Sequence, residues 1–308
     1  MDSENRMNAL TWGLLLLLGL IWGGSFFFAR IAVHHVPPFT LVLLRLSLAA
    51  VALHIYLAGR LRIYHVLQSH WRQFLLLGLI NNAVPHTLIF FGQTQMGAGL
   101  ASILNATTPI WTVLIGNQLT TDERLTSAKL AGCLAGLLGT AILLAPSVTD
   151  SASVPFWALL LPILAAISYG FAAIYAKRFK GIAPPVVAAG QLTGSSLIML
   201  PVALTIDQPW TLATPPVAAI AAILGMALLS TAFAYILYFR IMALAGATNA
   251  SLVTLLVPPS AMLLGFLFLG ERLGFTEIAG MMLIALGLLI LDGRTYAWIR
   301  HGMRAGAV

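Results

Sequence analysis

Charged residues are scarce in this chain, and the scarcity excludes most ordinary folds. Only 8% of its 308 residues are Asp, Glu, Lys or Arg, whereas a soluble domain has about 25%. Cysteine is nearly absent too, because Cys133 stands alone and cannot form a disulfide within the chain. Apolar residues make up 60%, and the mean hydropathy is +0.95. These values exclude a water-soluble globule, a disordered chain and a disulfide scaffold, and they predict an all-α protein in a lipid bilayer.

The chain has instead long stretches that lack Asp, Glu, Lys and Arg. A helix needs about 20 apolar residues to cross a bilayer, and stretches of this length predict ten crossings if Arg45 and Glu277 are each accepted inside one. The longest stretch is divided in two at Gly97 and Gly99, which are typical of a tight turn. The expected spans are 7–29, 37–57, two within 73–121, 130–149, 151–176, 181–206, 208–239, 241–270 and 274–291.

The basic residues are distributed unevenly between the two sides that these crossings define. Of the 16 lysines and arginines, only Arg30, Arg45 and Arg272 do not lie on the side that carries both termini. Basic loops stay in the cytoplasm, so we expect cytoplasmic N- and C-termini. The basic residues form no patch, and we therefore expect the bilayer, and not nucleic acid, as the partner of this net charge of +7.

The chain also contains an internal duplication, most visible where residues 97–109 recur as residues 246–258 with an offset of 149. It predicts two five-helix units, residues 10–145 and 155–292. Five is an odd number, so the second unit enters the membrane from the opposite side, which gives inverted repeats around a central cavity. Such repeats are typical of secondary transporters, although a duplication can also serve only to enlarge a bundle. The matching pairs are Gly97/Gly246, Ala98/Ala247, Ala101/Ala250, Ser102/Ser251 and Pro109/Pro258.

An ordered set of motifs accompanies the duplication: Trp22-Gly23-Gly24-Ser25-Phe26, Arg45, the two proline helices, and the turns Glu123-Arg124-Leu125 and Glu271-Arg272-Leu273. With this set the chain resembles the EamA family of the drug/metabolite transporter superfamily over nearly its whole length, and within it the YddG-type exporters of aromatic amino acids. The resemblance implies a ten-helix, monomeric carrier of the cell inner membrane that exports amino acids or other small metabolites. It also implies that the first, third, fourth, sixth, eighth and ninth helices surround the cavity.

Polar residues inside a span are costly in lipid, and their spacing indicates a path through the protein. Ser102, Asn105 and Thr108 precede Pro109 on one helix, and Ser251 and Thr254 precede Pro258 on another. Each proline lacks an N–H, which would free the carbonyls of Asn105 and Thr254. We therefore expect helix kinks at Pro109 and Pro258, and at Pro85 in the third span. Both faces would suit a polar substrate. The alternative is that these groups only form hydrogen bonds between helices.

The third span adds Asn82 and His86, four residues apart on either side of Pro85. His86 is either a transport residue or a structural hydrogen-bonding group. Arg45 lies about 12 Å inside its helix and needs a partner. Carbonyls or a carboxylate of the protein would make it structural, and a substrate carboxylate would make it part of the site. Aromatic surface for apolar groups or an ammonium comes from Trp22, Phe26, Trp111, Tyr169, Tyr235 and Tyr238.

Several chemistries lack their motifs. The sequence has no P-loop, no HExxH and no GxSxG, which argues against ATP hydrolysis and against an intramembrane enzyme, and we expect no cofactor or metal. No Asp or Glu lies near the centre of a span. We therefore expect facilitated or weakly coupled export of amino acids with broad specificity. Export of nucleosides or toxic compounds, and passive conduction through a channel, are the open alternatives.

Overall fold

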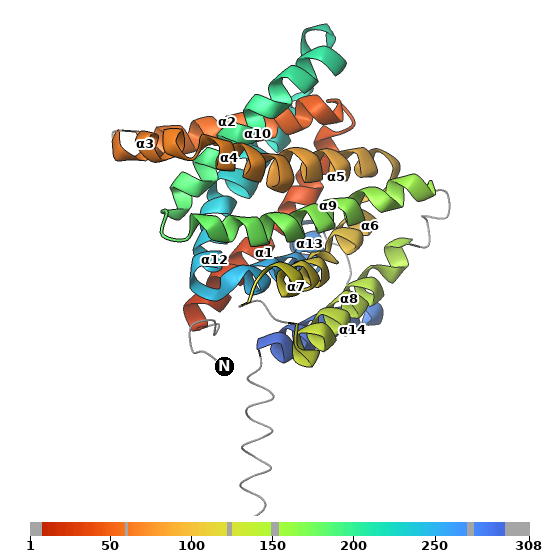
Figure 1. Cartoon of the computed structure of the whole chain (residues 1–308). Coiled ribbons are helices and arrows are strands. Elements are labelled where there is room, and N and C mark those ends of the chain that lie inside the picture. The colour runs from red at the N-terminus through yellow and green to blue at the C-terminus, as the bar shows by residue number, and fades with distance from the viewer. Residues whose placement is uncertain (1–7, 59–60, 122–124, 149–153, 270–273, 293–308) are drawn as a thin grey trace, which may run out of the picture.

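A computed structural model describes residues 8–58, 61–121, 125–148, 154–269 and 274–292, and these residues form helices and no strand (Figure 1). Both Glu-Arg turns and the basic residues of the two termini lie outside the described ranges. The first half contains α1 (Ala9–Ala32), α2 (Pro38–Leu57), α3 (Leu61–Ser69), α4 (Trp71–Gly78), α5 (Val84–Gln95), α6 (Ala98–Asn105), α7 (Thr108–Leu119) and α8 (Ser127–Val148). The second half contains α9 (Phe156–Ala176), α10 (Pro184–Ile206), α11 (Val217–Ala227), α12 (Ala234–Ser251), α13 (Val253–Leu269) and α14 (Phe275–Asp292).

Within the described ranges, six helical segments are long and apolar enough to cross a membrane: 9–32, 38–57, 71–95, 156–179, 184–206 and 217–251. Two further expected spans fall on the shorter apolar helices Lys129–Leu143 and Ile278–Ile290. The last two fall on the interrupted pairs α6–α7 and α12–α13. The protein is therefore an all-helical, multi-pass membrane protein, and the count of ten crossings stays a prediction.

Glycines mark the turns between successive crossings. The turn expected at Gly97 is present, because α5 ends at Gln95 and α6 begins at Ala98. Its counterpart Gly246 has φ 85° and ψ 172°, a conformation that glycine alone adopts without strain. The stretch 234–251 is thus two helices that meet at Gly246.

Two π-helical turns interrupt the long helices at matching places. Leu79–Ala83 joins α4 to α5, and Leu228–Phe233 joins α11 to α12. Their first residues are 149 positions apart, which is the offset of the sequence repeat. In the second turn the Thr231 hydroxyl donates to the carbonyl of Met226, five residues earlier, at 2.8 Å. A π-turn takes carbonyls out of the regular helical ladder and often marks a functional position.

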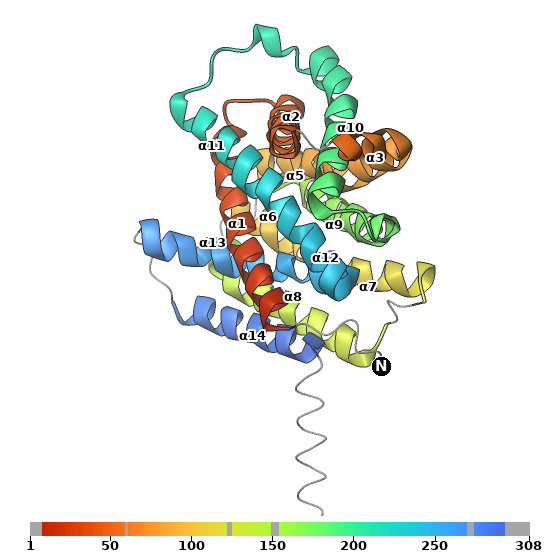
Figure 2. The same cartoon turned by 90° about the vertical axis from the view of Figure 1, so that its left-hand side faces the viewer.

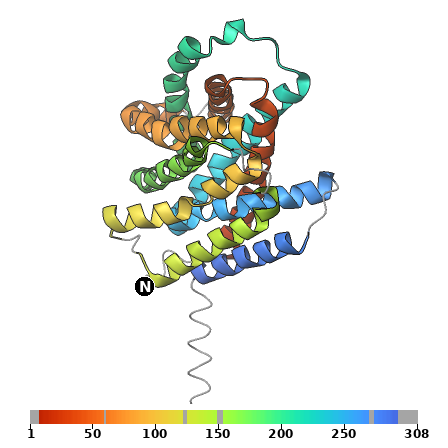
Figure 3. The same cartoon turned by 90° about the vertical axis from the view of Figure 1, so that its right-hand side faces the viewer.

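The helices approach each other closely at glycines. α8 and α14 lie side by side along one edge of the bundle (Figures 2 and 3). A Cβ atom on Gly139 would lie 2.7 Å from the backbone nitrogen of Ile284 and 2.8 Å from the carbonyl oxygen of Gly280. Between α1 and α13, a Cβ on Gly19 would lie 2.6 Å from the Cβ of Leu256. Small residues thus permit backbone contact where no hydrophobic effect drives helices together.

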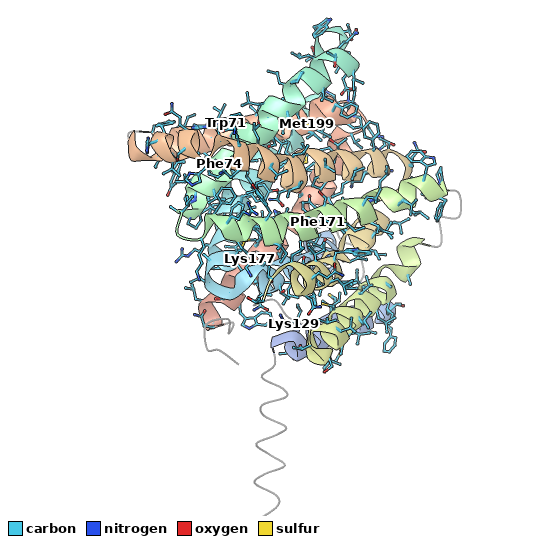
Figure 4. The ribbon with its side chains drawn as sticks, in the orientation of Figure 1. Trp71, Phe74, Lys129, Phe171, Lys177 and Met199 are labelled. Atoms are coloured by element: carbon cyan, nitrogen blue, oxygen red, sulfur yellow. The ribbon has the colours of Figure 1, made fainter. Side chains whose placement is uncertain are left out.

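The outward faces of the helices carry large apolar side chains. Phe171 on the outer face of α9 is 47% exposed (Figure 4). Polar side chains such as Asn82, Gln191 and Thr112 are fully buried between helices instead. This reversal of the water-soluble pattern is what a lipid surrounding requires.

We predict that Gly139→Ala destabilises the pairing of α8 with α14. Its methyl group would meet backbone atoms that cannot rotate away, at a cost of about 1–3 kcal/mol. Thermal unfolding in detergent, followed by fluorescence-detected size exclusion, measures the change. Gly13→Ala is the matched control, because nothing lies within 4 Å of its added Cβ. Equal melting temperatures for the two variants would contradict the packing described here.

Candidate substrate-binding pocket

A pocket of about 70 Å³ lies between the two halves of the chain. Its walls come from α1, α5, α6, α7, α9, α12 and α13, the helices that the resemblance places around a cavity, with additions from α2 and the first π-turn. Eleven of its lining residues are among those expected from the sequence: Trp22, Phe26, Arg45, His86, Asn105, Thr108, Tyr169, Tyr235, Tyr238, Ser251 and Thr254. The lining residues that were not expected are Ser25, Ala29, Asn81, Ile89, Phe90, Gln93, Val253 and Val257.

The first π-turn explains why Asn82 does not line the pocket. An unbroken helix would place Asn82 on the face of His86, four residues later. The wider turn at Leu79–Ala83 shifts the phase by about one residue, so Asn81, five residues before His86, shares its face instead. Asn82 is fully buried, and its Oδ1 accepts a hydrogen bond from the hydroxyl of Tyr235 at 2.5 Å. The Tyr235 hydroxyl also lies 3.3 Å from the carbonyl of Asn81, which Pro85 leaves without its helical donor.

The interruption between α6 and α7 likewise changes which of the polar residues before Pro109 face the pocket. Ala106 and Thr107 separate the two helices, so Asn105 and Thr108 reach the pocket while Ser102 does not. The carbonyl of Asn105, expected to be free, accepts a hydrogen bond from the Thr108 hydroxyl at 2.6 Å. Trp111 is also absent from the lining, and its indole N–H donates to the Thr107 hydroxyl at 3.2 Å.

The equivalent region of the second half is interrupted at a different place. α12 ends at Ser251 and α13 begins at Val253, so the break lies at Leu252, and Pro258 stands inside α13. A kink was expected at Pro258 itself. Ser251 and Thr254 flank the break and line the pocket, and the Thr254 hydroxyl donates to the Ser251 carbonyl at 2.9 Å. The two proline helices therefore reach the pocket through similar residues but are not symmetric.

The second π-turn is held by side chains from the first half. The indole N–H of Trp22 donates to the carbonyl of Ser230 at 3.1 Å, and the Ser230 hydroxyl donates to the carbonyl of Ile21 at 3.2 Å. From α2, the Nε of Arg45 donates to Oγ1 of Thr231 at 2.8 Å, and its Nη2 lies 3.4 Å from the Ser230 carbonyl. Thus α1 and α2 both bind this turn.

The first π-turn is held in the same way by α9 and α10 of the second half. The Ser168 hydroxyl donates to the carbonyl of Ile80 at 2.6 Å. The amide nitrogen of Asn81 donates to Oε1 of Gln191 at 2.8 Å. Each half therefore binds the π-turn of the other through its first two long helices.

Aromatic rings form one wall of the pocket. The Trp22 ring centroid lies 5.6 Å from that of Tyr238 and 6.3 Å from that of Tyr235. On the other side, His86 lies 6.4 Å from Tyr169 and stacks at 6.3 Å on Phe90. This arrangement can hold an apolar or aromatic group and offers π-faces to a cation.

Several buried polar atoms around the pocket make no hydrogen bond within the described part of the chain. Three of the residues concerned, His86, Gln93 and Asn105, line the pocket. A buried polar group without a partner costs about 1–3 kcal/mol, so such a cluster is expected where a ligand supplies the partner. The atoms are Asn82 Nδ2, His86 Nδ1, Gln93 Nε2 and Oε1, Asn105 Oδ1 and Gln191 Nε2.

Two of the unexpected lining residues had a signal in the sequence. Ser25 stands three residues after Trp22, and Gln93 stands seven residues after His86, so each shares a helical face with a residue that was expected. For Asn81 the signal was only that it is a polar residue within a span, next to Asn82, because the π-turn is what brings it to the face of His86. In the part of the chain that the structure describes, no three or more His, Cys, Asp or Glu residues come together in a group that could bind a metal.

The sequence is similar to a family of membrane transporters and to several of its members. The model of the EamA-like transporter family matches residues 10–145 and again 156–291. A probable terminal-alkyne amino-acid exporter of Streptantibioticus cattleyicolor is 26% identical over 98% of this chain and 99% of its own length. A probable amino-acid metabolite efflux pump of Salmonella typhimurium is 27% identical over 90% of this chain and 93% of its own. An uncharacterized transporter of Bacillus subtilis is 24% identical over 90% and 94%.

One solved crystal structure superimposes with a TM-score of 0.74, over 92% of this chain and 98% of its own, at 19% identity. At that identity the likeness concerns the fold alone. Together, the helical fold and the family match define a multi-pass membrane transporter. The chain belongs to the EamA-like transporter family.

We predict that Tyr235→Phe destabilises the protein by about 1–3 kcal/mol, because it leaves Oδ1 of the buried Asn82 without its donor. Thermal unfolding in detergent gives the change, and Tyr64→Phe, at a side chain that is 39% exposed, is the control. In the Tyr235→Phe background, Asn82→Leu removes a side chain that has already lost its donor. The substitution Asn82→Leu should therefore destabilise Tyr235→Phe less than it destabilises the wild-type protein. Additive losses would show that the hydrogen bond is not a coupled contact.

Proposed function

We propose that this protein is a secondary transporter that exports amino acids and similar small metabolites by alternating access. The observation that carries the proposal is the pocket between the halves, where aromatic rings meet buried polar groups that lack partners within the described chain. Such a site suits a small solute with an apolar part and a polar head. The printed names of two relatives, an amino-acid exporter and an amino-acid metabolite efflux pump, support the same substrate class.

The proposal includes the arrangement in the membrane. Ten crossings in two inverted units, residues 10–145 and 155–292, would allow the pocket to open to each side in turn. The hydrogen bonds at the π-turns support this symmetry. Side chains of α1 and α2 bind the second π-turn, and side chains of α9 and α10 bind the first. The distribution of basic residues supports cytoplasmic termini and insertion in the cell inner membrane. The protein would work as a monomer, since the proposed path lies within one chain.

We predict trans-stimulated exchange in proteoliposomes. Vesicles loaded with unlabelled phenylalanine should accumulate radiolabelled phenylalanine faster than empty vesicles, because a carrier returns more readily with substrate bound. A passive channel would show no stimulation. Absence of exchange for every amino acid in a panel, with nucleosides exchanged instead, would overturn the amino-acid proposal.

Trp22→Ala should lower this exchange by about tenfold, the factor that corresponds to 1.4 kcal/mol of lost interaction. The variant removes a ring of the aromatic wall and the donor to Ser230. Trp12→Ala is the matched control, because Trp12 lies on the same helix and is not among the lining residues. Equal rates in the two folded variants would remove Trp22 from the path.

A further inference from the structure

Among the described residues that line the pocket, Arg45 alone has a charged side chain. It is buried, with 6% of its surface exposed, and it comes from α2, a helix that otherwise contributes nothing to the lining. Removing a guanidinium from water is expensive unless an anion or a full set of acceptors compensates for it. What faces Arg45 therefore decides its role.

The partners of Arg45 in the described structure are all neutral. They are the Thr231 hydroxyl, the Ser230 carbonyl and the ring of Phe90, whose centroid lies 5.9 Å from the guanidinium carbon. Asp207 is the acidic residue whose side chain the structure describes, and it is engaged elsewhere. Its Oδ2 accepts hydrogen bonds from the backbone N–H of Thr40 at 2.7 Å and from the Thr40 hydroxyl at 2.9 Å. No described carboxylate balances the charge of Arg45.

The guanidinium is also oriented and incompletely used. A guanidinium has five N–H donors, and the two hydrogen bonds to the second π-turn account for two of them. These bonds hold the Nε side of the group against Ser230 and Thr231. The remaining donors stay available, in the planar geometry that binds both oxygens of a carboxylate.

The rest of the lining gives the occupant its remaining features. The aromatic wall of Trp22, Tyr235 and Tyr238 suits an apolar side chain. The described lining contains no aspartate or glutamate to bind an ammonium group, which would meet π-faces and the neutral groups of residues such as Asn105. The electrostatics thus favour a carboxylate strongly and an ammonium weakly.

From these observations we infer that Arg45 is the carboxylate-binding group of the pocket. The carboxylate is then required for recognition, and the α-amino group is dispensable. This inference rests on the proposed function, since it names the part of the substrate that the transport site recognises. It also separates amino acids and other small carboxylates, which bind, from amines and amides of the same shape, which do not.

Competition against exchange of radiolabelled phenylalanine tests the inference in proteoliposomes of the full chain. Hydrocinnamate, which lacks the amino group, should compete about as well as phenylalanine, and phenylalaninamide should compete at least about tenfold less well, the factor for one lost charge-assisted contact. Arg45→Gln should bring the acid and the amide to within about twofold of each other. Arg45→Lys should retain part of the preference, since it keeps the charge but loses the fork. Arg240→Gln, an exposed arginine outside the lining, is the control and should keep the wild-type preference.

A second measurement separates the failure of this inference from the failure of the proposed function. Hydrocinnamate should raise the melting temperature of the wild-type protein in detergent, phenylalaninamide should not, and Arg45→Lys should reduce the shift if Arg45→Gln does not fold. A carboxylate-specific shift without any exchange would support the subsite and overturn the transport proposal. If Arg45→Gln still exchanges substrate and prefers the acid over the amide as the wild type does, the assignment of Arg45 is wrong and the transport proposal stands.

Discussion

A polar group in hydrocarbon must find its partner within the protein, and every special feature of this chain follows from that constraint. The helices satisfy their own backbones and present apolar side chains such as Phe171 to the outside. Polar side chains are gathered between helices, where many of them bind backbone carbonyls, often of the same helix, or one another. Of the groups that remain without a described partner, those of His86, Gln93 and Asn105 line one pocket. In this setting unused hydrogen-bonding capacity is costly, so its concentration at one place carries functional information.

The π-turns are where this constraint and the duplication meet. Each turn takes carbonyls out of the helical ladder, and side chains from the first two long helices of the opposite half form hydrogen bonds with these carbonyls or with side chains beside them. The two halves are thereby linked by hydrogen bonds as well as by close apolar contacts such as that of Gly19 with Leu256. Arg45 breaks the symmetry. The start of α2, Pro37-Pro38, recurs 147 residues later as Pro184-Pro185 at the start of α10, and at this offset Leu192 corresponds to Arg45, with the neutral Gln191 beside it. The described lining is therefore asymmetric in charge, because its positive charge comes from the first half.

The sequence predicted the helical class, the six long spans and most of the pocket, because these depend on hydropathy and on a helical period of 3.6 residues. Its errors come from places where that period is broken. Asn81 lines the pocket in place of Asn82 at a π-turn, and Ser102 and Trp111 lie outside the lining where α6 and α7 are separated. The second half has an additional break at Leu252, six residues before Pro258. Single prolines do not determine whether a helix bends, widens or stops. Long-range contacts decide, such as that of Tyr235 with the Asn81 carbonyl, and a sequence alone does not display them.

Substrate protection of a cysteine in the pocket wall tests the central claim most directly. Ser25 lines the pocket from α1, and the single native cysteine, Cys133, can be replaced by alanine to give a thiol-free background. Ser25→Cys in that background should react with a small maleimide in membranes, and saturating phenylalanine should slow the reaction severalfold. Tyr64→Cys, at an exposed position, should react at the same rate with and without it. A Ser25→Cys rate that phenylalanine leaves unchanged, in protein that still exchanges phenylalanine, would contradict the assignment of the pocket as the transport site.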